Sequence, residues 1–308
     1  MADPLENKFS ALKDSGLRAF MIEGERLYPA DAVNFNISQQ RAFYDIYCAH
    51  FRKARPKSVK VTDFLVNAIP CRLYEPRACE GIPVLLYLHG GGYVLGGLES
   101  HDDICAEICD RADVAVVGVQ YRLAPEHPFP AAFEDAWHVL CELSRRFAKV
   151  IVGGDSAGGN LSAALALKAR DVAGPQIAGQ VLIYPGLGGD LTQGSYVSQA
   201  HALGLTTQDV IYYRDTYRGQ GHKYAEPLRE IFFKNLPSAF LVAAGMDPLG
   251  DDCENYARQL RLAGVTATVR HEPLLVHAFL RARHMSVPAR KSFSAIVDAV
   301  HNFAYPQI

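Results

Sequence analysis

Ser156 stands in the pattern Gly154-x-Ser156-x-Gly158, between an apolar β-branched run and a stretch rich in helix-forming residues. We expect a strand that includes residues 150–152, a helix over 161–170, and a tight turn between them. Glycines on either side let strand and helix pass closely, and such a turn pushes the side chain at its tip out of the packed layers. The pattern therefore predicts a nucleophilic serine. A glycine-rich helix start that binds an anion is the competing interpretation.

A second group of glycines, Gly90, Gly91 and Gly92, follows His89 at the end of the apolar run 82–88. Consecutive glycines free the backbone to turn its N–H groups inward. Acyl transfer needs such donors where negative charge develops on the substrate oxygen. A phosphate-binding loop is the alternative, but it typically adds a lysine and leads straight into a helix. We therefore expect an oxyanion-binding loop that continues into Tyr93.

Alternating apolar strands and helices supply the elements that must hold these two loops. We expect strands at 59–64, 69–74, 82–88, 114–119, 150–152, 177–184, 239–244 and 266–271, and helices at 103–111, 131–147, 161–170, 248–263 and 288–303. Apolar strands that alternate with helices form a parallel sheet that is covered on both faces. The predicted fold class is α/β, with a central, mostly parallel sheet flanked by helices.

Two segments lie outside this alternation. Residues 1–55 are amphipathic and helical, with more aromatic residues than a surface helix needs, and a polar link over 52–57 follows them. The segment at about 188–235, within 186–237, is too long for a simple connection and contains Tyr212, Tyr213 and Tyr217. We expect the two segments to form a helical cap on a catalytic domain of residues 56–308. Aromatic residues of 20–51 and these tyrosines are candidate walls of a substrate pocket.

Composition narrows the possible partners and compartment. The 308 residues carry 31 basic and 33 acidic side chains without a recurring basic block, which argues against nucleic acid. The N-terminus has no signal-peptide core and no apolar run reaches a membrane-spanning length, so we expect a cytoplasmic protein. The odd number of scattered cysteines fits a reducing compartment, with Cys105 and Cys109 as half-buried hydrophobes and no metal site. The cysteines are Cys48, Cys71, Cys79, Cys105, Cys109, Cys141 and Cys253.

Taken together, the motifs resemble the hormone-sensitive-lipase group of α/β-hydrolases, which includes the bacterial family IV-type esterases of the GDSAG subgroup. The matching motifs are His89–Gly92, Tyr121–Ala132, Gly154–Asn160 and Asp247–Leu249, and their order and spacing agree over most of residues 84–280. The resemblance implies an α/β-hydrolase fold. It also implies that the N–H groups of Gly91, Gly92 and Ala157 form the oxyanion hole, while His89 and Gly90 shape the loop.

The run Tyr121–Ala132 is assigned a structural role. Its three prolines stiffen a loop, and we expect Arg122 and Glu126 to form an ion pair with His127 nearby. A catalytic Glu126 is the minor alternative.

A serine hydroxyl needs a histidine to take its proton and a carboxylate to orient that histidine. In the fold that the chain resembles, the order along the chain is serine, acid, histidine. Asp247 follows the strand 239–244 and is the predicted acid. Asp251 and Asp252 come a turn later, at the start of a helix, where the helix dipole explains a carboxylate.

The base must lie beyond the last strand. Of His271, His277, His284 and His301, only His277 falls in an expected loop, at 274–279, and it is the predicted base. The family has His-Gly-Phe at this place, and here Ala278 replaces the glycine. Alanine disfavours positive φ, so we expect a slightly different loop geometry. A second departure is Gly250, where arginine is more usual.

These assignments predict a serine carboxylesterase that hydrolyses small to medium acyl esters through an acyl-enzyme on Ser156. An amidase or deacetylase with the same triad is an alternative. A non-catalytic small-molecule receptor on this fold is another, although the retained triad argues against it. The expected partner is a small-molecule ester, with no nucleic acid, membrane or cofactor. Both a monomer and a homodimer paired through a sheet edge are compatible with the sequence. Asp155, beside the nucleophile, is assigned to the turn and, with Tyr93, Tyr212 and Tyr213, to the pocket.

Overall fold

A single eight-stranded sheet forms the centre of the molecule in this computed structural model, which describes residues 3–76 and 81–306. The strand order is β1-β2-β4-β3-β5-β6-β7-β8. Strands β1, β2 and β4 pair antiparallel, and β4, β3 and β5 to β8 run parallel. The strands are β1 Lys60–Val66, β2 Ile69–Glu75, β3 Val84–Leu88, β4 Ala115–Val119, β5 Val150–Asp155, β6 Ile177–Ile183, β7 Ala239–Met246 and β8 Ala267–Val276. The predicted α/β class is confirmed. Cys79 lies outside the described residues.

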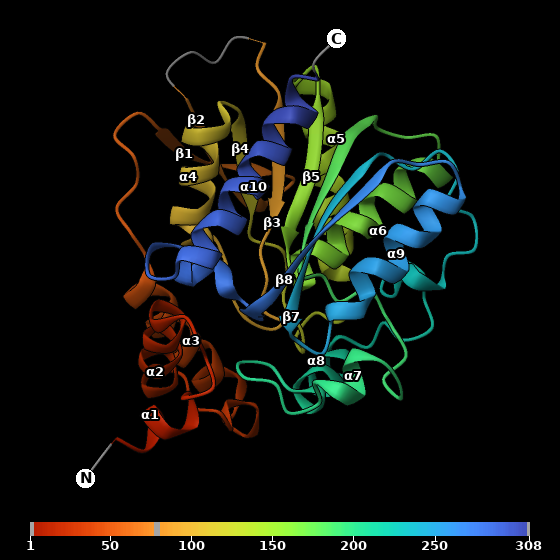
Figure 1. The fold of residues 1–308 in the computed structure, drawn as a ribbon. Coiled ribbons are helices and arrows are strands. Elements are labelled where there is room, and N and C mark those ends of the chain that lie inside the picture. The colour runs from red at the N-terminus through yellow and green to blue at the C-terminus, as the bar shows by residue number, and fades with distance from the viewer. Residues whose placement is uncertain (1–2, 77–80, 307–308) are drawn as a thin grey trace.

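Helices cover both faces of the sheet, as Figure 1 shows. Helices α4 and α10 pack on one face, and α5, α6 and α9 on the other. These helices are α4 Asp102–Ala112, α5 Ala131–Arg146, α6 Ala157–Asp171, α9 Gly250–Leu262 and α10 Val287–Ala304. Every residue of β3, β4 and β5 is buried, which explains why these strands are continuously apolar in sequence.

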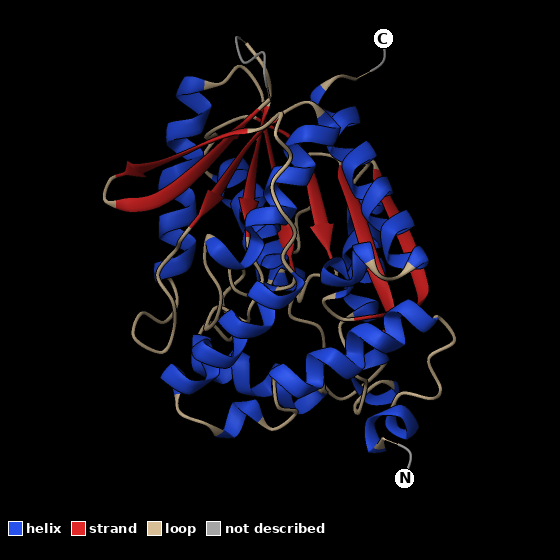
Figure 2. Cartoon of the chain, turned by 90° about the vertical axis from the view of Figure 1, so that its left-hand side faces the viewer, coloured by secondary structure: helices blue, strands red, loops and turns tan. Residues whose placement is uncertain are grey.

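The remaining helices lie beyond the carboxyl ends of the parallel strands (Figures 1 and 2). They are α1 Pro4–Lys8, α2 Ser15–Leu27, α3 Ile37–Phe51, α7 Ser195–Ser198 and α8 Thr207–Tyr217, and short 3₁₀ turns occur at Ala32–Asn34, Glu99–His101, Pro227–Arg229 and Phe279–His284. Capping boxes start α3 at Asn36 and α8 at Thr206, and such boxes define helix starts. The two segments predicted to form a cap therefore lie at the same end of the sheet.

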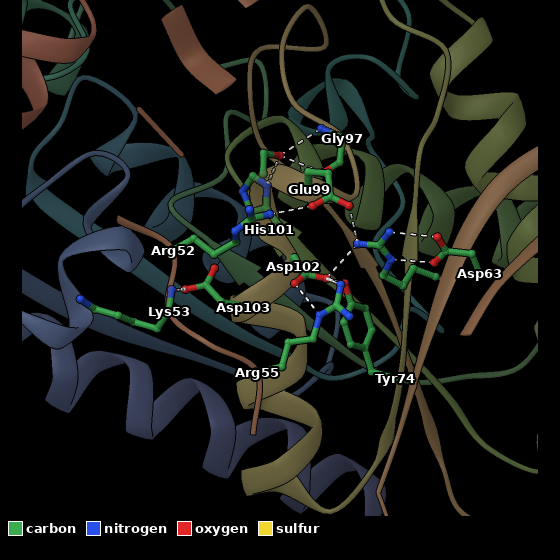
Figure 3. Close-up of polar contacts among 12 residues, drawn as sticks. Arg52, Lys53, Arg55, Asp63, Tyr74, Gly97, Glu99, His101, Asp102 and Asp103 are labelled. Carbon is green, nitrogen blue, oxygen red and sulfur yellow. Dashed lines mark hydrogen bonds and ion pairs between the residues drawn. The ribbon is translucent and has the colours of Figure 1, made fainter. Parts of the chain in front are cut away.

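The link between α3 and β1 is fixed to the start of α4 by ion pairs (Figure 3). Arg55 donates two hydrogen bonds to Asp102, at 2.7 and 2.8 Å. Arg72 of β2 donates to Asp102 at 2.9 Å and to Glu99 at 2.8 Å, and Arg52 donates to Glu99 at 2.6 Å. Burial alone would raise the pKa of Asp102, but the hydrogen bonds from Arg55, Tyr74 and Arg72 hold it below its usual value. The polar link predicted over residues 52–57 is therefore held against the start of α4 by these ion pairs.

Candidate active site

The turn from β5 into α6 holds Ser156 in a conformation that few residues adopt, with φ 54° and ψ −117°. The flanking glycines are required by the close approach of β3. A Cβ on Gly154 would lie 2.1 Å from the carbonyl oxygen of Leu88, and a Cβ on Gly158 would lie 1.8 Å from the same atom. Larger residues at either position would push β3 and the turn apart. The serine side chain consequently stands at the carboxyl end of the central strand.

His277 joins Ser156 to Asp247. Its Nε2 atom is 2.9 Å from Oγ of Ser156, and its Nδ1 atom is 2.7 Å from Oδ2 of Asp247. Asp247 is fully buried, and its other oxygen accepts the N–H of Leu249 at 2.9 Å. With a proton on Nδ1 donated to Asp247, Nε2 is left to accept the serine hydroxyl. The three residues predicted from sequence therefore lie in one hydrogen-bonded chain.

Strand β8 is longer than the sequence predicted. It runs to Val276 rather than ending near His271, so residues 274–276 are strand and His277 follows the last strand residue directly. The register shifts between the Ala244 and Met246 pairs of β7. Pro273 interrupts the apolar pattern here and is tolerated because β8 is an edge strand. Ala278 adopts φ 60° and ψ 21°, the left-handed conformation that suits glycine, so at this residue the alanine is held in a strained backbone.

The glycine loop after β3 also depends on positive φ angles, 118° at Gly91 and 60° at Gly92. A Cβ on Gly92 would lie 2.3 Å from the ring of Tyr213, so helix α8 packs directly on this loop. Ala157 is the first residue of α6, where the N–H group has no acceptor within the helix. Gly91, Gly92 and Ala157, whose N–H groups are the candidate oxyanion donors, all border the cavity that contains Ser156.

Asp155 ties the nucleophile turn to the glycine loop. Its Oδ1 atom accepts the hydroxyl of Tyr87 at 2.8 Å and the N–H of Gly90 at 3.1 Å. Burial would raise the pKa of this carboxyl, but His101 and the Tyr87 hydroxyl hold it well below its usual range. Although Asp155 borders the cavity, these contacts fix its carboxylate in the protein. No pattern in the sequence predicts this connection between the turn and the loop.

His89 is a buried neutral residue of the same loop. Burial lowers its pKa to about 3, so the ring carries no charge near neutral pH. Its Nδ1 atom is 2.8 Å from the carbonyl oxygen of Gly90, and the ring stacks on Tyr121 at a centroid distance of 4.2 Å. These contacts are those of a residue that shapes the loop.

A cavity of about 370 Å³ extends from Ser156 between the N-terminal helices and the segment 186–237. From the N-terminal side its walls include Phe20, Met21, Tyr28, Tyr44 and Tyr47. From the other side they include Tyr196, Leu205, Val210, Tyr213 and Tyr217. Of the predicted pocket residues, Tyr93, Asp155 and Tyr213 border the cavity. Tyr212 is not among the residues that line it, and its hydroxyl accepts a hydrogen bond from Gln40 of α3 at 2.8 Å instead.

The predicted ion pair between Arg122 and Glu126 is wrong. Arg122 donates instead to Asp135 of α5, at 2.8 Å from Nη2. Glu126 pairs with Arg41 of α3, at 2.7 Å, and Arg41 also donates to the carbonyl oxygens of Val94 and Ala124. Asp135 lies in the helix that follows the loop, and Arg41 is 85 positions before Glu126, so spacing within the loop could not identify either partner. The run nevertheless has a structural role, because it fastens α3 to the end of the glycine loop.

Sequence reasoning also missed Arg281 and His101. Arg281 is 6% exposed and His101 is 3% exposed. His101 contacts Asp155 of the nucleophile turn, and Arg281 contacts His101. The available signal was Arg281 within the largely apolar run 274–282, because a charge in such a run is buried only when polar groups surround it.

Over residues 3–76 and 81–306, no cluster of three or more histidine, cysteine, aspartate or glutamate side chains could hold a metal ion. None of the helices in the same part of the chain has the length and hydropathy needed to cross a membrane.

The sequence profile of the alpha/beta hydrolase fold matches residues 85–281. Esterase LipI of Mycobacterium tuberculosis is 37% identical to this chain, over an alignment that covers 72% of this chain and 75% of LipI. Carboxylic ester hydrolase LipN of the same organism is 36% identical, over an alignment that covers 91% of this chain and 80% of LipN. The solved structure of a Pyrobaculum calidifontis esterase superposes with a TM-score of 0.81 at 32% identity, over 88% of this chain and 94% of that one.

Proposed function

Because this chain belongs to the hormone-sensitive-lipase group of α/β-hydrolases and is a carboxylic ester hydrolase, we propose that Ser156 is its nucleophile and small to medium acyl esters its substrates. Two contacts carry this proposal: the hydrogen bond that Nε2 of His277 accepts from Ser156, and the one that its Nδ1 donates to Asp247. Residues 1–55 and about 188–235 act as a cap over a catalytic domain of residues 56–308.

The reaction begins when Oγ of Ser156 attacks the ester carbonyl carbon and Nε2 of His277 takes the serine proton. Asp247 holds the imidazole in the required tautomer and stabilises the imidazolium. The tetrahedral intermediate collapses as His277 returns the proton to the departing alcohol. Water then attacks the acyl-enzyme, again giving up a proton to His277, and the carboxylic acid leaves with Ser156 restored.

Negative charge develops on the carbonyl oxygen in both halves of the reaction. The N–H groups of Gly91, Gly92 and Ala157 stabilise it, because fixed backbone donors need no rearrangement when the charge appears. The positive φ angles of Gly91 and Gly92 support this assignment.

The cavity favours an uncharged ester. Its walls are largely aromatic and aliphatic, and its charged side chains already have partners: Lys8 pairs with Glu25 at 2.6 Å and Arg214 with Glu226. The carboxylate of Asp155 accepts from Tyr87 and Gly90, and that of Asp209 accepts from Thr206 at the start of α8. A substrate charge would compete with these pairs or lose its hydration without compensation. The size of about 370 Å³ is near the lower end for small-molecule pockets, which fits small to medium substrates.

We place the protein in a reducing cytoplasm, because its cysteines are odd in number and Cys48, Cys71 and Cys253 are buried in the core. A monomer and a homodimer both fit the proposed reaction, and the exposed edge strand β8 is the natural surface for pairing.

The proposal is tested with p-nitrophenyl esters from acetate to laurate, and with matched p-nitroanilides, on the wild type and on Ser156→Ala. We expect turnover of the shorter esters, little turnover of anilides, and loss of ester turnover in Ser156→Ala. Equal rates on anilides would favour the amidase alternative. Binding of the esters without turnover by the wild type would favour a receptor.

A further inference from the structure

We propose that Arg281 is a positioning residue for the oxyanion hole, acting through His101 and Asp155 on the N–H group of Gly90. This inference depends on the proposed function, since it concerns how the same site is held in its working geometry. It assigns a role to a buried cation that takes no part in the reaction steps above.

Arg281 lies in the 3₁₀ turn just after His277, and its guanidinium is almost fully buried. Nη1 donates to the carbonyl oxygen of Ser100 at 2.7 Å, and Nη2 donates to the hydroxyl of Tyr44 at 3.1 Å. The guanidinium carbon also lies 5.4 Å from the ring centroid of Tyr44 and 5.8 Å from that of Tyr47. Both distances are within the range of cation–π attraction.

Among the ion pairs of the described residues, none joins Arg281 directly to a carboxylate. A buried cation is costly unless an anion compensates it. Asp155 supplies one, and Nε2 of His101 contacts both groups, 3.3 Å from Nη2 of Arg281 and 3.2 Å from Oδ1 of Asp155. Because a ring nitrogen that donates its proton to Asp155 cannot also accept from Arg281, the guanidinium acts on this carboxylate through its charge, which helps to lower the pKa of Asp155. Arg281 and Asp155 are therefore a buried charge pair, and Nε2 of His101 contacts both of them.

Asp155 passes this constraint to the glycine loop. Both oxygens of Asp155 face Nε2 of His101, and Oδ1 also accepts the Gly90 N–H at 3.1 Å, while a Cβ on Gly90 would lie 2.5 Å from Oδ2. The glycine loop therefore packs directly against the carboxylate of Asp155 at Gly90. A small movement of Asp155 would shift Gly90 and, with it, the donors of Gly91 and Gly92.

The backbone around His101 cannot easily compensate. Its neighbours Glu99 and Asp102 are held by Arg52 and Arg55 of the link between α3 and β1 (Figure 3). Both carboxylates also accept from Arg72. The Lys53 N–H donates to Asp103 at 3.1 Å. When Arg281 is removed, the adjustable parts are the ring of His101 and the carboxylate of Asp155, and these are the groups that hold the loop.

The molecule offers a matched control in Arg283. It lies two residues away in the same turn and is also buried, but it pairs with Asp103 at 2.6 Å and Glu107 at 2.7 Å. Arg281→Met and Arg283→Met each remove one buried guanidinium from one turn. Only the first removes a group connected to Asp155.

The experiment compares the two variants with the wild type by thermal unfolding, by kcat and KM per titrated active site on p-nitrophenyl butyrate, and by inhibition with butylboronic acid. A boronate bonded to Ser156 places an oxygen in the oxyanion hole, so its affinity reports the position of the donors. We expect Arg281→Met to lower kcat by about tenfold to a hundredfold and to weaken boronate binding in parallel, because small displacements of oxyanion donors have effects of this size. Arg283→Met should lower the melting temperature but change kcat and boronate affinity less than about threefold.

Equal kcat and boronate affinity in the two variants, within about threefold, would overturn the inference. If Arg281→Met does not fold, Arg281→Lys against Arg283→Lys gives the same comparison, with the loss in Arg281→Lys smaller because the charge remains. The proposed function is judged separately by the wild type and Ser156→Ala. If the wild type turns over esters but the Arg281 and Arg283 variants have equal kcat and boronate affinity, the role of Arg281 is rejected while the proposed function stands.

Discussion

Nε2 of His277 lies 2.9 Å from Oγ of Ser156, although the two residues are 121 positions apart in the chain. The distance is within hydrogen-bond range for a general base and its nucleophile. It is set by two backbone features: the strained turn that exposes Ser156, and the end of β8, which places His277 beside it.

Replacing Asp247 with asparagine tests the orientation of this base. Asparagine keeps the size of the side chain but can present an N–H group to Nδ1, which favours the tautomer with its proton on Nε2. We expect kcat to fall about ten-thousandfold, as in other serine hydrolase triads, measured per titrated active site. Asp251→Asn is the control, since Asp251 binds the N–H of Ser195 and should leave kcat within about threefold. Comparable rates in both variants would reject Asp247 as the acid.

Gly92→Ala tests the glycine loop. The new Cβ would meet the ring of Tyr213 at 2.3 Å, at a residue with φ 60°. We expect kcat to fall by about a hundredfold or more, because the loop must move away from α8. Gly264→Ala is the matched control, with φ 78° and no atom within 4 Å of the added Cβ. It should lose stability but keep its activity, whereas an equal loss of kcat in both variants would contradict a local effect at the oxyanion hole.

Asp252 should make stability fall as pH rises. Burial raises its pKa from 3.8 to about 6, against opposing hydrogen bonds from the Leu187 N–H and the Tyr196 hydroxyl. The folded state therefore holds this proton more tightly than the unfolded state, so the contribution is complete below about pH 4 and is lost as pH rises through about 6. With about 1.4 kcal/mol for each pKa unit, the loss is about 3 kcal/mol.

Urea unfolding of the wild type and Asp252→Asn at acidic and neutral pH measures this contribution. The asparagine does not titrate, and its amide oxygen can still accept the N–H of Leu187. We expect the wild type to lose stability relative to Asp252→Asn on going from about pH 4 to about pH 7. Parallel curves over that range would show that Asp252 titrates normally.

Ala278→Gly should relieve the strain beside the base. A left-handed alanine costs about 1–2 kcal/mol, and the greater freedom of glycine in the unfolded chain offsets about 0.4–1 kcal/mol of that relief. We expect a net gain in unfolding free energy of up to about 1.5 kcal/mol. Ala263→Gly, at φ −86°, is the control and should destabilise by about 0.5–1 kcal/mol. Similar losses in both variants would mean that Ala278 is unstrained.

The order of strands and helices, and the positions of Ser156, Asp247 and His277 at strand ends, could be predicted because each depends on local pattern. The β-branched run before Gly154 indicates a buried strand, and Asp247 comes directly after another strand. The end of β8 could not be found in this way, because Pro273 breaks the alternation that marks a strand.

Ion-pair partners and side-chain directions could not be predicted from the sequence either. Arg122 binds Asp135 of α5 rather than Glu126, and Glu126 binds Arg41 of α3, 85 positions before it in the chain. Tyr212 and Tyr213 are adjacent in sequence, but the direction of α8 turns only the second toward the cavity. Side-chain direction on a helix follows from its packing, which composition does not specify.

The cavity walls have a consequence for how the protein acquires activity. Gln40 meets Tyr212 across 172 residues, and Arg281 meets Tyr44 across 237, so the walls close only when distant parts of the chain come together. Such non-local contacts are slow to form because a long loop must close first. During refolding, ester turnover should therefore return after the helical signal of the chain. Recovered activity then reports the complete assembly of the molecule, rather than the formation of its central sheet.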